Sequence, residues 1–466
     1  APDDAEPARQ QTGGDVGLPT GRERHDQANR PGGEAVGVGA GGWHAHGGRP
    51  AQAQQRAPRG ARRCQCHPRL SFFRLASTSP FATAHIAVTR WRGGGATPEI
   101  WTRKSAPIWL WVLFLIVAGV ALTTVLMIVV ASPHGEWDAW SIWDMRARFL
   151  FRGVEAGAPF NPLMEWSHLD YPLLVPSAVA GLWAWNGGEE QWLAAVVAIS
   201  FLGSAFVVVL LALARLRSTT LGLTAGLVLA GTPLLTRNAG ALYADVPVAY
   251  FFMAAVALGL LALEAEEGRP LAFLAGLHAG MAAWTKNEGL MFCGIFVLSF
   301  CLVIRRRSEF MQRFRFLGPA LLGMLVVLVF VGHFKFHFAP ANDLIAAGKS
   351  ASMVARVADL SRYTMVFWSI VEGLLTFGDW VVPPVFVMGV WLALQGLRRV
   401  ESGAIVWPFV AASLQLFGYL VVYVVGSDRL EWQLQTSVER LLLQIWPLAV
   451  FSLMLLVRDS PATEKR

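Results

Sequence analysis

The chain has 466 residues, of which 54% are hydrophobic and 15% are charged, and its formal net charge is +7. Soluble domains carry about 25% charged residues, so this composition excludes an ordinary soluble globular protein. The charge excess lies within residues 1–104, which hold 15 Lys and Arg against 8 Asp and Glu and leave 24 of each for the rest, so it gives no reason to expect a nucleic-acid partner.

Residues 1–105 are rich in Gly, Ala, Arg, Gln and Pro and show no apolar periodicity. Such a composition buries too little surface to offset chain entropy, so we predict a disordered basic tail. The chain opens with Ala1 and its first methionine is Met127, inside an apolar run. A fragment, a non-methionine start and translated upstream sequence would each account for this, and we favour the last two. Metal-ligand residue types in the tail are interpreted as incidental, and we expect no metal or cofactor: His44, His46, Cys64, Cys66 and His67.

The segment 106–466 is predicted to be a multi-pass transmembrane domain. Apolar runs of about 20 residues, which cross a ~30 Å hydrocarbon core, recur along it. They lie near 107–131, 190–214, 219–236, 243–264, 270–285, 288–304, 316–334, 380–397, 404–425 and 440–457. Two shorter pieces, 171–185 and 363–377, are interrupted by Pro or Gly and suit helices at the membrane interface. We therefore expect an all-α polytopic membrane protein of about ten spans with a long first external loop.

Arginine clusters orient these spans. They follow the second, sixth, eighth and tenth apolar runs, as Arg215 and Arg217, Arg305 to Arg307, Arg398 and Arg399, and Arg458. With ten spans all these ends share one face, which the positive-inside rule makes cytoplasmic. Loops 132–189, 237–242, 286–288, 335–379 and 426–439 then face outward. We expect a location in the plasma (inner) membrane with the active site on the periplasmic, extracytoplasmic side.

The first external loop contains "HGEWDAWSIWDMRARFLFRG", from His134 to Gly153. Its three tryptophans, spaced three residues apart, fit an aromatic belt at the membrane interface, and its acids are then solvated. The stretch "EWDAW" favours a second interpretation, because a carboxylate between two indoles is partly desolvated and suits a general base. Glu136 and Asp138 are the two acids concerned. The arginines of this loop oppose the positive-inside trend, so we expect anionic partners for them.

Further ionisable residues occur at the predicted outer ends of spans. "SHLDYPLLVP" contains His168 and Asp170, and "LYADVPVAYF" contains Asp245. Ionisable groups at membrane depth are costly and indicate functional sites. Each one alone is also compatible with a helix cap or an ion pair, as for Lys286 and Glu288 in "WTKNEG". The start of the last span, "TSVERLLLQIWPL", adds Arg440.

The ordered motifs "WDAWSIW…AR", "H-x-D-Y-P-L-L-x-P", "A-D-V-P", "T-K-N-E-G" and "E-R-x-L-L…P" resemble the GT-C superfamily of membrane glycosyltransferases. The branch they resemble is the bacterial one related to protein O-mannosyltransferases and aminoarabinose transferases. The resemblance implies a catalytic carboxylate in the first external loop, a polyprenyl-phosphate sugar as donor, and a lipid, glycan or protein as acceptor beside the membrane lipids. The mannosyltransferases have two adjacent acids at this position, where Trp137 separates Asp138 from Glu136 here.

By position, the resemblance assigns Asp138 as the catalytic base with Glu136 as its companion. It assigns Lys286 and Arg440 to the lipid phosphate. Relatives often have "H-P-P" where this chain has His168-Leu169-Asp170, which leaves the acceptor contacts open. We expect His168, Asp170, Asp245 and Glu288 to contact substrate.

A base for the acceptor hydroxyl and cations for the departing phosphate would suffice for sugar transfer, and a single displacement would invert the anomeric centre. A nucleotide-sugar site is not expected, because the body of the chain has no glycine-rich phosphate loop, and "GVGAGG" lies in the tail without a strand or helix around it. The alternative is a secondary transporter of a polar solute or lipid-linked substrate. Transporters place charges near the bilayer midplane and repeat their halves, and neither pattern is visible here.

Overall fold

The structure is a computed structural model that describes residues 106–153, 158–305, 310–340, 350–398, 403–426 and 429–458. The tail and its candidate metal ligands lie outside these ranges. Across the described ranges the chain is helical and forms no β-strand; an isolated bridge pairs Leu397 with Val457. The prediction of an all-α polytopic protein is confirmed at this level.

The helices follow one another along the chain with short connections. They are α3 (Ile108–Ala131), η2 (Ala139–Trp143), α4 (Asp144–Arg152), η3 (Ala158–Phe160), η4 (Pro162–Ser167), α5 (Leu174–Asn186), α6 (Trp192–Leu216), α7 (Thr219–Ala230), α8 (Pro233–Gly240), α9 (Asp245–Glu264), α10 (Arg269–Thr285), α11 (Asn287–Ile304), α12 (Phe310–His337), α14 (Ser350–Ala358), α15 (Leu360–Thr376), η5 (Phe377–Asp379), α16 (Pro384–Gln395), α17 (Gly403–Val425) and α18 (Leu430–Leu456).

Seven described helices are long and apolar enough to cross a membrane: α3, α6, α9, α11, α12, α17 and α18. Two further pairs of helices qualify only as bent units, which raises the number to as many as nine. The pair α7 and α8 is bent by 61°, and the α15–η5 segment meets α16 at 86°. Helix α10 has 17 residues, which falls short of a span of 18. The predicted count of about ten therefore stays a prediction.

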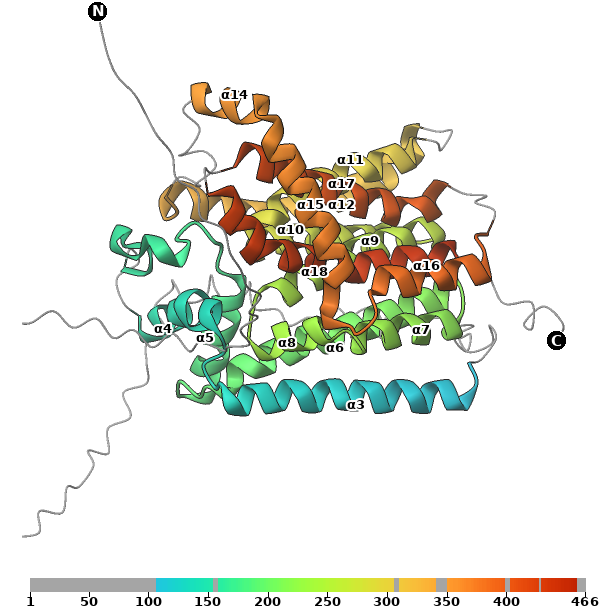
Figure 1. The fold of residues 1–466 in the computed structure, drawn as a ribbon, viewed down its shortest axis with the longest axis horizontal. Coiled ribbons are helices and arrows are strands. Elements are labelled where there is room, and N and C mark those ends of the chain that lie inside the picture. The colour runs from blue at the N-terminus through green and yellow to red at the C-terminus, as the bar shows by residue number, and fades with distance from the viewer. Residues whose placement is uncertain are drawn as a thin grey trace, which may run out of the picture. The chain divides into compact units, whose positions relative to one another are not determined.

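Helices α9 and α3 are similarly apolar but differ in how much of their surface is buried. Helix α9 is apolar on all sides and is buried along almost its whole length against α6, α10 and α18, as expected of a central helix. Helix α3 is equally apolar but lies at the edge of the bundle, packing on α7 and α8, and most of its large side chains are exposed. Figure 1 shows it running along one border of the bundle. An exposed apolar face of this length suits contact with lipid.

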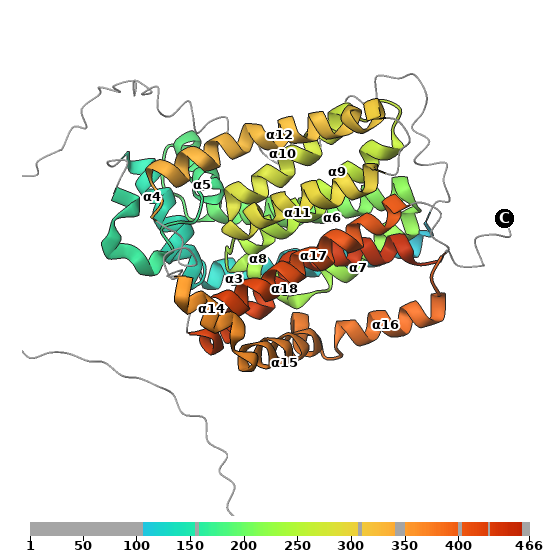
Figure 2. The same ribbon diagram turned by 90° about the horizontal axis from the view of Figure 1, so that it is seen from above.

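The two ends of the bundle differ in chemistry. At one end, Arg217 donates to the backbone carbonyls of Leu455 and Val457, and the backbone amides of Arg398 and Arg458 bond to Leu456 and Gly396. Helices α4 and α5 of the first predicted loop gather at the other end (Figures 1 and 2). These described arginines of the basic clusters therefore share one end, as the topology prediction requires.

The predicted start of the last span is wrong. Helix α18 begins at Leu430, so Arg440 lies inside the helix and not at its outer start. The segment before Arg440 is polar on one side, so its average hydropathy is too low to indicate a membrane span. Its apolar residues Leu430, Leu434 and Val438 recur every four positions and are all buried, which makes the segment an amphipathic helix.

Candidate functional site

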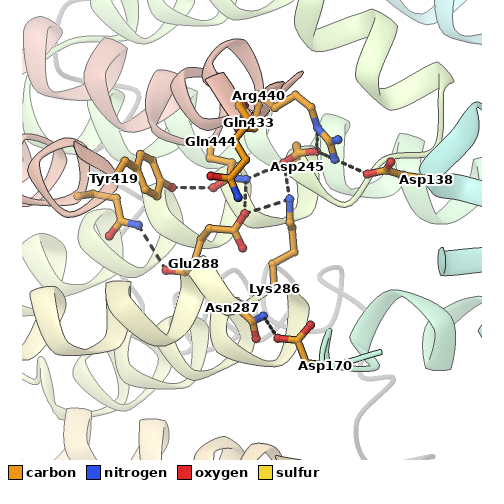
Figure 3. A network of polar contacts seen from close by, with 12 residues as sticks. Asp138, Asp170, Asp245, Lys286, Asn287, Glu288, Tyr419, Gln433, Arg440 and Gln444 are labelled. Carbon is orange, nitrogen blue, oxygen red and sulfur yellow. Dashed lines mark hydrogen bonds and ion pairs between the residues drawn. The ribbon is translucent and has the colours of Figure 1, made fainter. Parts of the chain in front are cut away.

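Five of the predicted site residues meet in one polar network (Figure 3). Asp138 comes from the first loop, immediately before η2, and Asp245 begins α9. Lys286 forms the turn between α10 and α11, Glu288 lies in the first turn of α11, and Arg440 projects from α18. The bundle thus brings together residues that are up to 302 positions apart in the chain.

Asp245 is the centre of the network. Its side chain is 0% exposed. Its Oδ1 accepts from Lys286 Nζ at 2.9 Å and from Gln444 Nε2 at 2.6 Å. Its Oδ2 accepts from both Nε and Nη2 of Arg440, at 3.0 and 2.8 Å. With both oxygens engaged by charged and amide donors, Asp245 serves as a counter-ion that holds two cations and is not placed to act as a base.

Arg440 joins this centre to the first loop. Its Nη2 also donates to Asp138 Oδ2 at 2.5 Å, and its guanidinium lies over the Tyr243 ring, 4.7 Å from the centroid. The side chains of Arg440 and Asp138 are 24% and 15% exposed, so this edge of the network is open to solvent. No group in the described part of the chain accepts from Arg440 Nη1. An anion arriving from solvent can therefore bind there.

Lys286 is enclosed by partners. Its Nζ lies 2.9 Å from Asp245 and 3.2 Å from Glu288, so the predicted ion pair with Glu288 is present. The Tyr171 ring is 5.5 Å away, and only 4% of the side chain is exposed. Burial alone would lower the pKa of Lys286, but the two carboxylates outweigh burial and raise it above its ordinary value, so the ammonium stays charged. Lys286 stabilises the network from within.

Three uncharged residues that the sequence analysis missed complete the inner side. Gln444 lies one helical turn after Arg440, and its Nε2 also reaches Glu288 Oε1 at 3.3 Å. Because Gln444 Nε2 faces carboxylates, its Oε1 must accept, and Tyr419 OH donates to it at 2.6 Å. On α17, Gln415 donates to the backbone carbonyl of Glu288 at 3.3 Å. The spacing of Gln415 and Tyr419, one helical turn apart within an apolar run, was the available signal.

The loop before η2 directs Asp138 into the network and Glu136 outward. The Glu136 amide donates to the Ala241 carbonyl at 3.1 Å, which ties the loop to the end of α8. Gly135 has φ +70°, and a Cβ there would lie 2.6 Å from the same carbonyl oxygen, so only glycine fits this approach. The Glu136 side chain is exposed and has no polar partner among the described residues. The geometry therefore favours Asp138 over Glu136 as the residue that acts with Arg440.

A fully buried arginine, Arg146, organises the "SHLDY" turn. Its guanidinium donates to the backbone carbonyls of Ser167 and His168 at 2.6 Å each, and to that of Tyr171 at 3.0 Å. Burial lowers the pKa of Arg146 to about 10, so it is still charged at neutral pH. The expectation of anionic partners for the loop arginines is confirmed for Arg152, which pairs with Glu189. The hydrogen bonds of Arg146 go to carbonyl oxygens instead, while the charge of Asp170 attracts this cation and its Nε has no hydrogen-bond partner among the described residues.

Asp170 and His168 lie beside the central network. Asp170 accepts from Asn287 Nδ2 at 2.6 Å. Lys335, which the sequence analysis did not consider, donates to the Asp170 carbonyl at 2.5 Å and to Asn287 Oδ1 at 2.6 Å. The His168 ring is exposed and stacks on Tyr171, with 5.0 Å between centroids. Because Asn287 stands between Lys286 and Glu288 in the chain, the Asp170 cluster supports the turn that carries these residues.

The three tryptophans of the first loop have different environments. Trp137 and Trp140 are exposed and pack edge to face, with centroids 4.6 Å apart. Trp143 is buried and stacks on Tyr171 at 5.6 Å, so it is a core residue and the interpretation of all three as an interface belt is wrong for it. The π-helical turn Ala139–Trp143 contains both the exposed Trp140 and the buried Trp143. Such turns occur frequently at functional sites.

Comparison with known proteins finds no match to a protein-family model, to a curated protein or to a solved structure. Among the described residues, no cluster of three or more His, Cys, Asp or Glu side chains could hold a metal ion. The network itself supplies three carboxylates and two cations. Its chemical capacity is therefore that of an acid–base residue, Asp138, next to a guanidinium with free donors.

Proposed function

We propose that this protein is a membrane glycosyltransferase. It moves a sugar from a polyprenyl-phosphate-linked donor to a hydroxyl of a lipid, glycan or protein acceptor at the outer face of the membrane. The observation that carries the proposal is the contact between Asp138 of the first loop and Arg440 of the last helix. This contact unites a carboxylate that can take a proton with a cation that can hold a phosphate, in the order along the chain that the GT-C resemblance implies.

In the proposed reaction Asp138 accepts the proton of the acceptor hydroxyl as the acceptor oxygen attacks the anomeric carbon. The bond between the anomeric carbon and the phosphate oxygen breaks, and its electron pair leaves with the polyprenyl phosphate. Arg440 Nη1 faces the charge that develops on that phosphate. A positioned base contributes about 10²–10⁴-fold to such a step. Fixed cations at developing charge contribute at least as much. This single displacement inverts the anomeric centre.

The geometry changes the role of the second cation. Lys286 was expected to contact the lipid phosphate, but Asp245 and Glu288 already occupy its ammonium and leave it almost fully buried. We assign Lys286 the indirect role of fixing Asp245. Asp245 in turn holds Arg440 through two hydrogen bonds. Arg440 is then the residue that meets the phosphate.

We also propose that the site faces the extracytoplasmic side. The support is that the site and the basic residues Arg217, Arg398 and Arg458 lie at opposite ends of the bundle. In a cysteine-free background, a cysteine at Leu163, whose side chain is 85% exposed, should react with an impermeant thiol reagent in spheroplasts. A cysteine at the exposed Glu267, beyond the far end of α9, should react only after lysis. The reverse pattern would overturn the orientation.

A secondary transporter is the second candidate. The bent pair α7–α8 and the 86° bend before α16 favour it, because broken helices often line transport sites. A transporter would move a labelled polyprenyl-phosphate sugar across liposomes without chemical change. The glycosyltransferase would instead release polyprenyl phosphate.

The experiment that tests the proposed function is incubation of the purified full chain with a panel of radiolabelled polyprenyl-phosphate sugars. We expect at least one sugar to be transferred to an added membrane extract, or slowly hydrolysed, with release of polyprenyl phosphate. Inactivity toward the whole panel, together with transport by the same preparation in liposomes, would reject the glycosyltransferase in favour of the transporter.

A further inference from the structure

Arg440 is held by its two carboxylate partners in unequal ways. Asp245 is fully buried, accepts from two nitrogens of the guanidinium and lies on a central helix of the bundle. Asp138 is partly exposed, accepts from one nitrogen and lies in the helical turn that leads into η2. If one of the two contacts opens, it is the contact to Asp138, because Asp138 makes one hydrogen bond where Asp245 makes two and is the more exposed carboxylate.

The geometry of the guanidinium makes this bond an obstacle to a phosphate. A guanidinium offers two edges for bidentate binding of an oxyanion, Nε with Nη2 and Nη1 with Nη2. Asp245 uses the first edge with a single oxygen. Asp138 takes the Nη2 donor of the second edge and leaves only Nη1 without a partner in the described chain. A phosphate can therefore bind this edge through two hydrogen bonds only if Asp138 withdraws.

Charge leads to the same conclusion. The network already contains Asp138, Asp245 and Glu288 against Lys286 and Arg440. A phosphate placed beside a bound Asp138 would put a third anion on one guanidinium in a largely buried site, where like charges repel strongly. Exchange of one anion for the other keeps the number of anions on Arg440 at two.

We infer that Asp138 occupies the phosphate position on Arg440 in the ligand-free protein, and that the phosphate of the lipid-linked donor displaces it. The inference rests on the proposed function and adds its regulation. Asp138 becomes available to take a proton only once the donor is in place. Arg440 is thus the phosphate ligand and, before the donor binds, the residue that holds Asp138 back from the reaction.

The test is a double-mutant cycle on phosphate binding, with farnesyl phosphate in detergent as the probe and calorimetry as the readout. Asp138→Asn removes the competing anion, so it should tighten binding by about tenfold or more, the scale of one close charge pair. In the Arg440→Gln background, Asp138→Asn should have no effect, because the contested cation is absent. A role of Asp138 in folding alone would weaken binding instead. Glu136→Gln controls for general loss of negative charge and should change binding less than twofold.

Either of two results would overturn the inference. If Asp138→Asn leaves binding unchanged or weakens it, the two anions do not compete. If it tightens binding equally in the Arg440→Gln background, simple repulsion explains the effect. Thermal unfolding of each variant, with Arg440→Lys as a charge-preserving second variant, verifies that the proteins are folded.

Two further probes separate the source of the ligand from the function. Farnesol should bind equally to wild type and Asp138→Asn, because it lacks the anion. If inorganic phosphate reproduces the tightening, a free phosphate suffices; if only farnesyl phosphate does so, the ligand is a lipid-linked phosphate, and both results support exchange. Tightening without sugar transfer would retain the exchange and reject the glycosyltransferase. Sugar transfer without tighter phosphate binding would retain the glycosyltransferase and reject the exchange.

Discussion

Arg146 and Arg440 are two largely buried arginines at the same end of the bundle, and their partners differ in kind. Arg146 is 0% exposed and donates to three backbone carbonyls of the turn it organises. Arg440 is 24% exposed, and its partners are the carboxylates of Asp138 and Asp245. Carbonyls are fixed by the chain and cannot be exchanged for a ligand. A partly exposed carboxylate that accepts a single hydrogen bond can be replaced by another anion, so Arg146 has a structural role and Arg440 can bind a ligand.

The largest expected effect on stability follows from removing Arg146. Arg146→Met would remove three hydrogen bonds from a charged donor, each worth about 1.5–3 kcal/mol, so the free energy of unfolding should fall by about 4 kcal/mol or more. Arg440→Met should cost less, because Asp245 keeps Lys286 and Gln444. Thermal unfolding in detergent measures both. Equal losses of unfolding free energy for Arg146→Met and Arg440→Met would contradict the distinction between these arginines. Arg148→Met, at a partly exposed residue 3.8 Å from Glu189, is the matched control and should cost less than about 1 kcal/mol.

A smaller and pH-dependent effect is expected at Asp144, on the same helix as Arg146. Burial raises the pKa of Asp144 to about 7, although Arg148 attracts the carboxylate. In the unfolded chain the pKa is about 4. Between these values the folded state keeps a proton that the unfolded state releases, so stability should fall as pH rises from about 4 to 7 and level off above that. Asp144→Asn should remove this slope and be more stable than wild type by about 3 kcal/mol at pH 8, measured by unfolding across pH. A lower stability of the variant at pH 8 would contradict the assignment.

The smallest effect is expected at Lys335, which belongs to the architectural side of the comparison. Lys335→Met removes the hydrogen bonds to the Asp170 carbonyl and to Asn287, while Asp170 keeps its bond from Asn287. The free energy of unfolding should fall by about 1–2 kcal/mol. The affinity for farnesyl phosphate should stay within about twofold of wild type. A large loss of affinity with little loss of stability would place Lys335 in the ligand site.

The sequence identified most of the charged residues of the polar network but not the contacts among them. Asp138, Asp245, Lys286, Glu288 and Arg440 were found because ionisable groups are conspicuous in apolar surroundings. Gln415, Tyr419 and Gln444 were missed because uncharged polar residues are ordinary in such helices, and only packing reveals which face they occupy. The partners of Arg146 could not be predicted, because every residue has a backbone carbonyl and the sequence does not show which ones accept from a side chain.

The fold shows the same limits. Long apolar runs predicted the candidate spanning helices, because a helix of about 20 apolar residues matches the thickness of the hydrocarbon core. The amphipathic first third of α18 was not predicted, because the polar neighbours of its buried residues Leu430 and Leu434 lower the average hydropathy. The bend of 86° before α16 coincides with Gly378, which has φ +84°, and with Pro383 and Pro384, and a hydropathy average does not register these residues.

The central claim is that Asp138, which Arg440 binds in the ligand-free protein, is the base of a sugar transfer. The most direct measurement is the turnover of Asp138→Asn with the best polyprenyl-phosphate sugar, compared with wild type and Glu136→Gln. We expect turnover to fall by about 10²–10⁴-fold for Asp138→Asn, with the protein folded, and much less for Glu136→Gln, whose side chain faces solvent. Near wild-type turnover of Asp138→Asn would contradict the claim, and inactivity of Glu136→Gln in the same experiment would transfer the catalytic role to Glu136.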